Sequence, residues 1–308
     1  MDGSRRKTHQ RLWFHAQGVV PASPGLRFTQ LRGLFSLMTL RIAALLTCHN
    51  RRDMTSVCLR SLRSQSGLTI TGFQLNVFLV DDGCTDGTVE AALEIWPDAK
   101  IIPGDGKLYW CGGMRKAWRA AATTDPDYYL LVNDDTFLYP EAVQDLLAIC
   151  PVPEATAIAV GAIRDPRTGQ WVYGGNQSDN EFLEGAHAPR VCRTMNANCT
   201  LVPRAVYRKI GMLHYAYDHA MGDTDYGLEA GRHGIRTYES TSFVGECEPN
   251  PEAGSWRDKS LPRIVRFQKL VSAKGLPPKD WLYYCRRNCG ALWLRYWLSP
   301  YIRVILGK

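Results

Sequence analysis

The sequence has no apolar run that approaches the roughly 20 residues of a membrane-spanning helix. The nearest stretch runs from Leu34 to Leu46, and Arg41 interrupts it. No small-residue cleavage site follows, so the stretch does not have the pattern of a secretory signal. By hydropathy we therefore do not expect an integral membrane protein.

Cysteine occurs ten times, but never as a CxxC pair, and no set of Cys and His has the spacing of a zinc finger or zinc ribbon. We interpret the cysteines as small buried apolar residues of a protein in a reducing compartment. The expected localisation is cytoplasmic, and zinc is not expected.

Three common ligand-binding loops are also missing. No GxGxxG follows the first predicted strand, and no P-loop is present. The acidic loop after Val80 is close to EF-hand spacing, but the twelfth position counted from Asp82 is Leu93, where calcium needs a bidentate glutamate. These gaps argue against a Rossmann dinucleotide site, a P-loop NTPase and an EF-hand.

The 308 residues suffice for one large α/β domain with an appendage, and a hydrophobic content of 45% is ordinary for a chain that buries a core. The net charge of +7 is uneven, because Arg and Lys are concentrated in residues 1–60 and 257–308. This suggests that the ends contact anionic surfaces while the chemistry lies in the middle. A nucleic-acid partner is not expected, because the basic residues do not line an aromatic-interleaved groove.

Short apolar runs alternate with helical patterns up to Cys150, which is typical of a parallel sheet built from βαβ units. We predict an α/β fold in which helices flank a mostly parallel central sheet. The segment 108–113 is interpreted as an aromatic, glycine-rich loop before a basic helix over 114–122. A second, mixed region follows Cys150. The predicted strands are 41–46, 75–80, 100–102, 128–132, 157–163, 170–173 and 196–202. Later helices are predicted from Arg204 to Gly211 and from Gly222 to Gly234.

Two adjacent carboxylates, Asp134 and Asp135, follow the predicted strand 128–132. Open α/β sheets bind ligands at the carboxyl ends of their strands. Neighbouring acids repel each other unless a cation or proton intervenes, and Mg²⁺ or Mn²⁺ takes carboxylate and phosphate oxygens. The pair predicts a divalent-cation site, and a solvated Asn-Asp-Asp turn is the alternative.

Four separated stretches resemble, in order, motifs of the family 2 inverting glycosyltransferases, whose GT-A fold binds a nucleotide-sugar. They span about two thirds of the chain, residues 41–245. Two departures stand out, because Gly222 replaces the first acid of the family's Glu-Asp-x-Asp and His49 replaces a commoner tyrosine. The four stretches are Thr47–Arg51, Val80–Thr88, Asn133–Asp135 and Gly222–Asp225.

The resemblance implies a role for each matching residue. Asp135, helped by Asp134, would bind the metal that bridges the diphosphate, and Asp223 would be the general base. The nucleobase would be held by Thr47 and Asp82. For Asp223 and Asp225 the alternative is an acid favoured by a helix dipole. Further candidates are His49, Arg51, Gly112, Gly113 and Asp134 for the nucleotide-sugar, with Asp225 and Lys116 in support.

The implied enzyme is an inverting hexosyl- or deoxyhexosyltransferase that uses a nucleotide-sugar and Mn²⁺ or Mg²⁺. Its acceptor would be a hydroxyl of a glycan or lipid-linked glycan, in bacterial cell-surface polysaccharide synthesis. One base on one face implies single displacement. The alternatives are an inactive relative that binds carbohydrate or nucleotide, and a sugar-phosphate nucleotidyltransferase. The latter lacks its Gly-rich signature after the first strand.

We expect three parts: a mobile N-terminal extension at 1–37, a GT-A domain at 38–245 and a C-terminal helical extension at 246–308. Met38 stands just before the first predicted strand and is a candidate start. Aromatic and Arg side chains after Trp281 suit an anionic membrane surface, on the inner face of the cell membrane. The alternative is that these rings are ordinary core. Pro300 is expected to divide the segment into two short helices.

Overall fold

The computed structural model describes residues 39–68, 72–175 and 185–308, so the extension predicted for residues 1–37 lies outside the described part. Residues 39–308 cluster into one compact unit. Among the described helices, none is both long and apolar enough to cross a bilayer.

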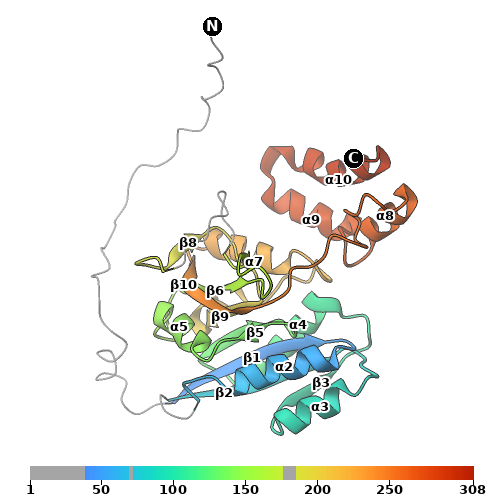
Figure 1. Ribbon diagram of the computed structural model, residues 1–308. Helices are drawn as coiled ribbons and strands as arrows, with labels where there is room; N and C mark the ends of the chain where they lie inside the picture. The colour runs from blue at the N-terminus through green and yellow to red at the C-terminus, as the bar shows by residue number, and fades with distance from the viewer. Residues whose placement is uncertain (1–38, 69–71, 176–184) are drawn as a thin grey trace, which may run out of the picture. The chain divides into compact units, whose positions relative to one another are not determined.

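A mixed sheet of ten strands forms the centre of this unit (Figure 1). Its strand order is β3-β2-β1-β4-β9-β6-β10-β5, while β7 pairs with β6 and β8 pairs with β10. The strands are β1 (Leu40–Cys48), β2 (Phe73–Asp81), β3 (Lys100–Pro103), β4 (Tyr128–Val132), β5 (Phe137–Leu138), β6 (Ala157–Arg164), β7 (Trp171–Tyr173), β8 (Arg190–Cys192), β9 (Cys199–Pro203) and β10 (Arg236–Glu246).

Strands β3, β2, β1 and β4 are parallel to one another, so their carboxyl ends lie at one edge of the sheet. Strand β9 is antiparallel to both β4 and β6, and it joins this parallel part to a mixed second part. The prediction of a parallel βαβ region followed by a mixed region is confirmed. The acids that follow β2 and β4 therefore lie at the same edge.

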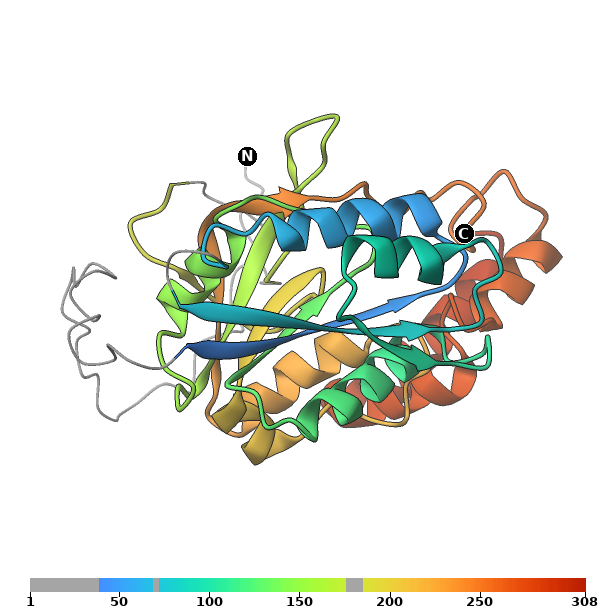
Figure 2. The ribbon, with the colours of Figure 1, turned by 90° about the horizontal axis from the view of Figure 1, so that it is seen from below.

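Helices cover both faces of the sheet. Figure 2 shows α2 and α3 on one side, with α4 and α7 on the other. The apolar side chains divide in the same way, because α2 and α5 pack into one core cluster and α4, α6 and α7 into a second. These helices are α2 (Arg52–Arg63), α3 (Thr88–Ile95), α4 (Tyr109–Ala122), α5 (Ala142–Ile149), α6 (Arg204–Ile210) and α7 (Gly222–Arg232).

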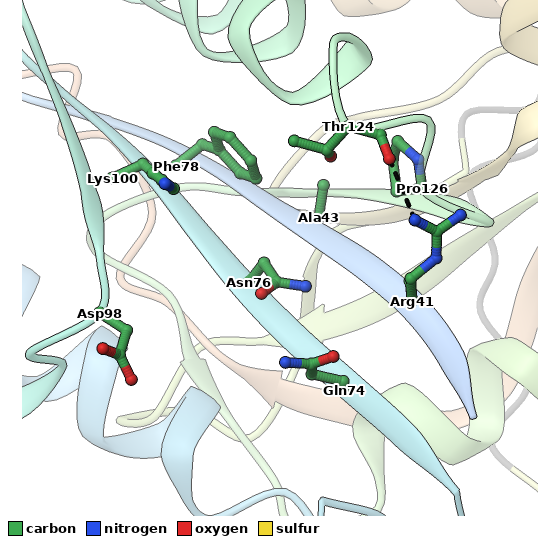
Figure 3. Close-up of a pocket in the computed structure, with 9 residues that line it drawn as sticks. All are labelled: Arg41, Ala43, Gln74, Asn76, Phe78, Asp98, Lys100, Thr124 and Pro126. Carbon is green, nitrogen blue, oxygen red and sulfur yellow. Dashed lines mark hydrogen bonds between the residues drawn. The ribbon is translucent and has the colours of Figure 1, made fainter.

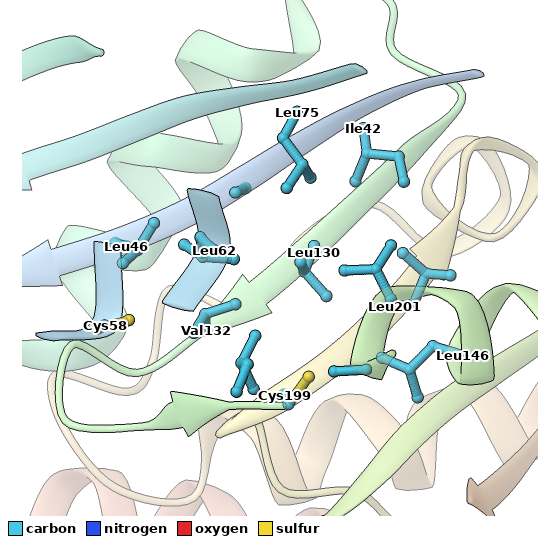
Figure 4. Packing of buried hydrophobic residues seen from close by; sticks show 14 of the residues in the cluster. Ile42, Leu46, Cys58, Leu62, Leu75, Leu130, Val132, Leu146, Cys199 and Leu201 are labelled. Atoms are coloured by element: carbon cyan, nitrogen blue, oxygen red, sulfur yellow. The ribbon is translucent and has the colours of Figure 1, made fainter. Parts of the chain in front are cut away.

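Strand β1 explains why the central strands are continuous apolar runs. Ile42 and Leu46 face the cluster of α2 and α5, which Figure 4 shows from close by. Ala43 and Leu45, between them, face the cluster of α4. Successive side chains of a strand point to opposite faces, so a sheet covered on both sides needs an apolar residue at each position.

The loop predicted over residues 108–113 is wrong, because α4 already begins at Tyr109. Gly112 and Gly113 are buried inside this helix. A Cβ on Gly113 would lie 2.1 Å from the Oγ1 of Thr47. Glycine lowers helix propensity by about 1 kcal/mol, and here it permits the close approach of α4 to the end of β1.

The C-terminal part contains four short helical segments. Pro300 does not divide it as predicted, because Pro300 lies inside the last helix and the break falls at Gly290. A proline cannot donate to the carbonyl four residues earlier, and that carbonyl, of Tyr296, instead accepts from the indole Nε1 of Trp281 at 3.2 Å. The segments are α8 (Arg263–Val271), α9 (Pro278–Asn288), η1 (Gly290–Leu292) and α10 (Trp293–Ile305).

Candidate active site

The acid pair lies directly after β4, where Arg51 binds both of its members. Arg51 Nη1 lies 3.0 Å from Asp134 Oδ1, and Nη2 lies 2.7 Å from Asp135 Oδ2. Burial raises the pKa of Asp134 to about 7, with Arg51 opposing the shift and Asp135 adding to it. The Asp135 side chain is 21% exposed against 7% for Asp134. One carboxylate is therefore held within the protein, and the other is reachable from solvent.

The donor set around Asp135 fits a cation shared with a substrate. Among the described residues, no three His, Cys, Asp or Glu side chains come together as a metal-binding group. One accessible carboxylate suits Mg²⁺ or Mn²⁺, which commonly completes its shell with substrate phosphates and water. The nearby Cys247 thiol stays neutral, because burial raises its pKa to about 12.

A chain of amide hydrogen bonds connects Asn133, the residue before the acid pair, to Asp223. Asn133 Nδ2 donates to Asn198 Oδ1 at 3.2 Å, and the Asn198 backbone N–H donates to Asn196 Oδ1 at 3.0 Å. Asn196 Nδ2 then donates to Asp223 Oδ2 at 3.4 Å. The structure therefore links the segment that follows β4 to Asp223, which is 90 positions after Asn133 in the sequence.

Asp223 lies in the first turn of α7 and is half-buried as a residue. Its Oδ1 accepts from the Thr224 N–H at 2.7 Å, and its Oδ2 accepts from the Ala197 N–H at 3.3 Å. Burial raises the pKa of Asp223, while these two N–H groups act in the opposite direction. A carboxylate with a raised pKa is suited to accept a proton.

Asp225, unlike Asp223, is fully buried and paired with a positive charge. Its side chain is 2% exposed, and its Oδ1 accepts from Arg287 Nε at 3.1 Å and Asn288 Nδ2 at 2.8 Å. Both partners belong to the C-terminal region, in α9. The contact therefore attaches α9 to α7, and the supporting residue predicted from sequence lies in an inter-helix ion pair.

Asp82 holds the loop between β3 and α4. Its buried carboxylate accepts from the backbone N–H groups of Gly106 at 2.9 Å, Leu108 at 3.0 Å and Tyr109 at 3.1 Å. The adjacent Asp81 is only half-buried, and its carboxylate accepts from the Cys84 N–H at 2.7 Å. Asp81 was not among the predicted site residues, although its place in the Asp-Asp pair was a usable signal.

The other predicted residues lie around this edge, but not all of them face it. His49 is exposed, and its Nδ1 lies 2.6 Å from the Asp82 carbonyl oxygen. Thr47 is half-buried against Gly113 of α4. Lys116 donates to the Pro103 carbonyl, so its ammonium group is already paired with the end of β3.

Trp110 is a site residue that the sequence interpretation missed. Its indole Nε1 donates to Asn133 Oδ1 at 2.8 Å, and its backbone N–H donates to His219 Nδ1 at 3.4 Å. Burial, with a smaller effect of Lys274, lowers the pKa of His219 to about 4, so the ring is a neutral acceptor. Asn196, Asn198 and His219 have no motif around them that would have marked them.

Three of the four non-glycine residues with positive φ in the described part lie close to the site residues, and the fourth, Asp125, precedes β4. Asn50, Tyr109 and Met221 have positive φ angles of 51°, 51° and 67°, which side chains other than glycine rarely adopt. They lie next to Arg51, Trp110 and Gly222. Such conformations cost on the order of 1–3 kcal/mol each and are typical of functional sites.

A pocket of about 240 Å³ lies at the opposite end of the parallel strands (Figure 3). Gln74, Asn76 and Lys100 line it from the amino-terminal halves of β2 and β3. It contains none of the predicted site residues. The candidate site is instead the sheet edge that carries Asp135, and the chemistry of its side chains marks it.

Comparison with known proteins identifies the class. The structure matches a mannosyltransferase from Pyrobaculum calidifontis, solved in complex with GDP-Man and Mn²⁺, with a TM-score of 0.55 at 15% identity, over 87% of this chain and 70% of that one. It also matches S. aureus TarS in complex with UDP-GlcNAc, with a TM-score of 0.51 at 12% identity, over 87% of this chain and 81% of that one. The fold is that of the GT-A glycosyltransferases.

The sequence then gives the family. Residues 44–211, more than half of the chain, match the model of glycosyl transferase family 2. The chain belongs to this family. It is 26% identical over 192 residues to an N-acetylglucosaminyl-diphospho-decaprenol L-rhamnosyltransferase of Mycobacterium tuberculosis. That match covers 52% of this chain and 62% of the relative.

Proposed function

We propose that this protein is a glycosyltransferase that moves a hexosyl or deoxyhexosyl group from a nucleoside-diphosphate sugar to a hydroxyl group, with inversion at the anomeric carbon. The observation that carries the proposal is the amide chain that joins Asn133, in the segment of the acid pair Asp134 and Asp135, to Asp223. One carboxylate can hold a cation against the diphosphate, and the other can accept the proton of the acceptor.

In this mechanism Asp223 accepts the proton of the acceptor hydroxyl as its oxygen bonds to the anomeric carbon. The bond from that carbon to the diphosphate breaks, and its electron pair leaves with the diphosphate. Asp135 would hold Mn²⁺ or Mg²⁺, and the cation would supply positive charge for that leaving group. Arg51, which already binds Asp134 and Asp135, lies where it can add a second positive charge.

For the donor, we propose that Asp81 and Thr47 contact the nucleobase. Asp82 shapes the same pocket through the loop that it holds, because three N–H groups of residues 106–109 already bind its carboxylate. Gly112 and Gly113 likewise act through packing, since a Cβ on Gly113 would overlap Thr47. His49 contacts the Asp82 carbonyl oxygen and so lies beside the same pocket.

For the acceptor, we propose a lipid-linked glycan used in cell-surface polysaccharide synthesis on the cytoplasmic side of the membrane. The support is the relative described as acting on an N-acetylglucosaminyl-diphospho-decaprenol. This acceptor is a proposal in its own right, because the match covers less than two thirds of the relative.

The test has two stages. A thermal-shift screen of nucleoside-diphosphate sugars with and without Mn²⁺ identifies the donor, because a bound ligand raises the melting temperature. Release of nucleoside diphosphate is then measured with polyprenyl-diphosphate N-acetylglucosamine and with a water-soluble N-acetylglucosaminide. Metal-dependent stabilisation by one nucleotide class and acceptor-dependent release support the proposal. Stabilisation without release from any glycan acceptor would favour a binding protein.

A further inference from the structure

The aromatic residues expected at a membrane surface differ in how far they are covered. Trp281 stacks on Tyr284 with ring centroids 5.3 Å apart. Trp297 and Tyr301 pack with Leu270 in a separate small core, in which Tyr301 is 9% exposed. Tyr296, by contrast, is 50% exposed. Part of the segment is thus core, and its contact with a membrane stays a prediction.

Several aliphatic side chains of the same C-terminal helices are exposed to solvent. Four residues of α10 are 37–59% exposed, and they follow one another at intervals of four, four and three. That spacing places them on one helix face, opposite the face that packs on α8 and α9. We call these residues the α10 stripe: Leu294, Leu298, Ile302 and Ile305. Ile264 of α8 and Leu306, which follows α10, are exposed by 66% and 58%.

The charge around the stripe is strongly positive. Residues 257–308 hold twelve Lys and Arg against two Asp. Arg295 and Arg303 are exposed on α10 itself, and each directly follows a residue of the stripe. One of the two acids, Asp280, is buried and accepts from the Asp218 N–H at 3.0 Å. The C-terminal region thus combines an apolar helix face with a large excess of cations over acids in its sequence.

We propose that the α10 stripe binds the surface of an anionic lipid bilayer. An amphipathic helix with this arrangement inserts its apolar face about 5–10 Å into the headgroup region, while Arg meets lipid phosphate. A second copy of the chain is disfavoured as the occupant, because a two-fold contact through α10 would set two equally positive regions against each other. Anionic lipid supplies the opposite charge.

Contacts between successive helices link the α10 stripe to the candidate active site. Helix α9 lies between α10 and α7 (Figure 1), and Arg287 of α9 binds Asp225 and Glu229 of α7. Asp223 lies in the first turn of the same helix α7. Membrane binding through α10 would therefore hold Asp223 at a fixed position near the bilayer. This last step rests on the proposed lipid-linked acceptor, whereas binding itself does not.

The experiment is vesicle flotation of the full chain without donor or acceptor. Vesicles of phosphatidylcholine alone are compared with vesicles that also contain phosphatidylglycerol. The test variant is Leu298→Gln with Ile302→Gln. Its matched control is Val57→Gln with Leu93→Gln, which are 45% and 38% exposed on the sheet-covering helices α2 and α3. A charge variant combines Arg295→Gln with Arg303→Gln. Melting temperature and transfer to a water-soluble acceptor report on the fold of each protein.

The parent and the control variant should float with the anionic vesicles and be released by high salt. Binding of the stripe variant to anionic vesicles should be at least about tenfold weaker, because it lacks two aliphatic side chains that would be buried in the bilayer. The charge variant should lose about fivefold per charge on anionic vesicles only. Absence of flotation of the parent, or unchanged flotation of the folded stripe variant, would overturn the proposal. So would a parent dimer that the stripe substitutions convert to monomer without any effect on flotation.

Discussion

Arg51 and Asp135 form an ion pair at the carboxyl edge of the sheet, with Nη2 and Oδ2 2.7 Å apart. The same guanidinium binds Asp134, so one positive charge faces two carboxyl groups. Because Asp135 remains partly exposed, the pair leaves a carboxylate oxygen that a divalent cation can reach. Arg51 orders the acids and leaves them electrostatically attractive to a cation.

Asp135→Asn should abolish metal-dependent binding of the donor while the protein stays folded. The amide keeps the size of the side chain but removes the charge that holds the cation. We expect at least a tenfold loss of nucleoside-diphosphate affinity in Mn²⁺, measured by calorimetric titration, and loss of transfer. Asp98→Asn, an exposed acid at the opposite end of the strands, is the control and should bind normally. Full transfer in excess chelator would refute a metal role.

Asp223→Asn should lower the turnover by a factor on the order of 10²–10⁴, because the variant lacks the proton acceptor. Donor affinity should change little, since Asp223 does not contact the metal side of the site directly. Steady-state rates at saturating donor, together with a donor titration, separate the two effects. A variant that turns over at nearly the parent rate would assign the base elsewhere.

The pH dependence of transfer follows from the same residue. Burial raises the pKa of Asp223 above its ordinary value of 3.8. A base works only when ionised, so activity should fall as the pH drops through this raised pKa, at a higher pH than for an exposed aspartate. The profile of kcat/KM against pH measures this limb. If the residual activity of Asp223→Asn keeps the same limb, another group is titrating.

Asp225→Asn should affect stability rather than chemistry, although the residue is only two positions away. The substitution removes the charge from a buried contact with Arg287 and Asn288. Hydrogen bonds to charged groups contribute about 1.5–3 kcal/mol, so we expect a fall of this size in the free energy of unfolding. Urea denaturation measures it. Transfer to a water-soluble acceptor should stay within a few-fold of the parent, and a large loss of turnover in a stable variant would count against this assignment.

Gly113→Ala and Gly231→Ala should shift stability in opposite directions. The new methyl group at 113 would overlap Thr47 Oγ1, and overpacking of this kind costs about 1–3 kcal/mol. At 231, in α7, nothing lies within 4 Å of the added Cβ. Alanine there should stabilise the helix by about 0.5–1 kcal/mol. Melting temperatures of the two variants test the pair, and equal shifts would show that α4 can move away from β1.

The strands and their acidic ends were predictable, because a buried parallel strand requires an unbroken apolar run and the acids follow it directly. The start of α4 was not, since the glycines that suggest a loop are needed for contact with Thr47. That contact joins residues far apart in sequence, so the local helix propensity of residues 109–113 could not predict it.

The separate environments of Asp223 and Asp225 show the same limit within one motif. Both acids fit the family pattern, yet one lies beside Asn196 and the other beside Arg287. Asn196 precedes the two acids in the sequence and Arg287 follows them, so only the fold distinguishes the two environments. The apolar face of α10 was likewise hidden, because the sequence shows many rings and aliphatic residues without showing which of them are covered.

The links between Asn133, Asn198 and Asn196 are all made by amide groups, and this limits proton transfer along them. An amide donates and accepts hydrogen bonds but does not gain or lose a proton near neutral pH. The chain therefore holds Asp223 relative to Asn133, beside the acid pair, without offering a path for proton transfer along its links. A proton that Asp223 accepts must leave by another route, and a cation at the acid pair can act on Asp223 only through its electric field.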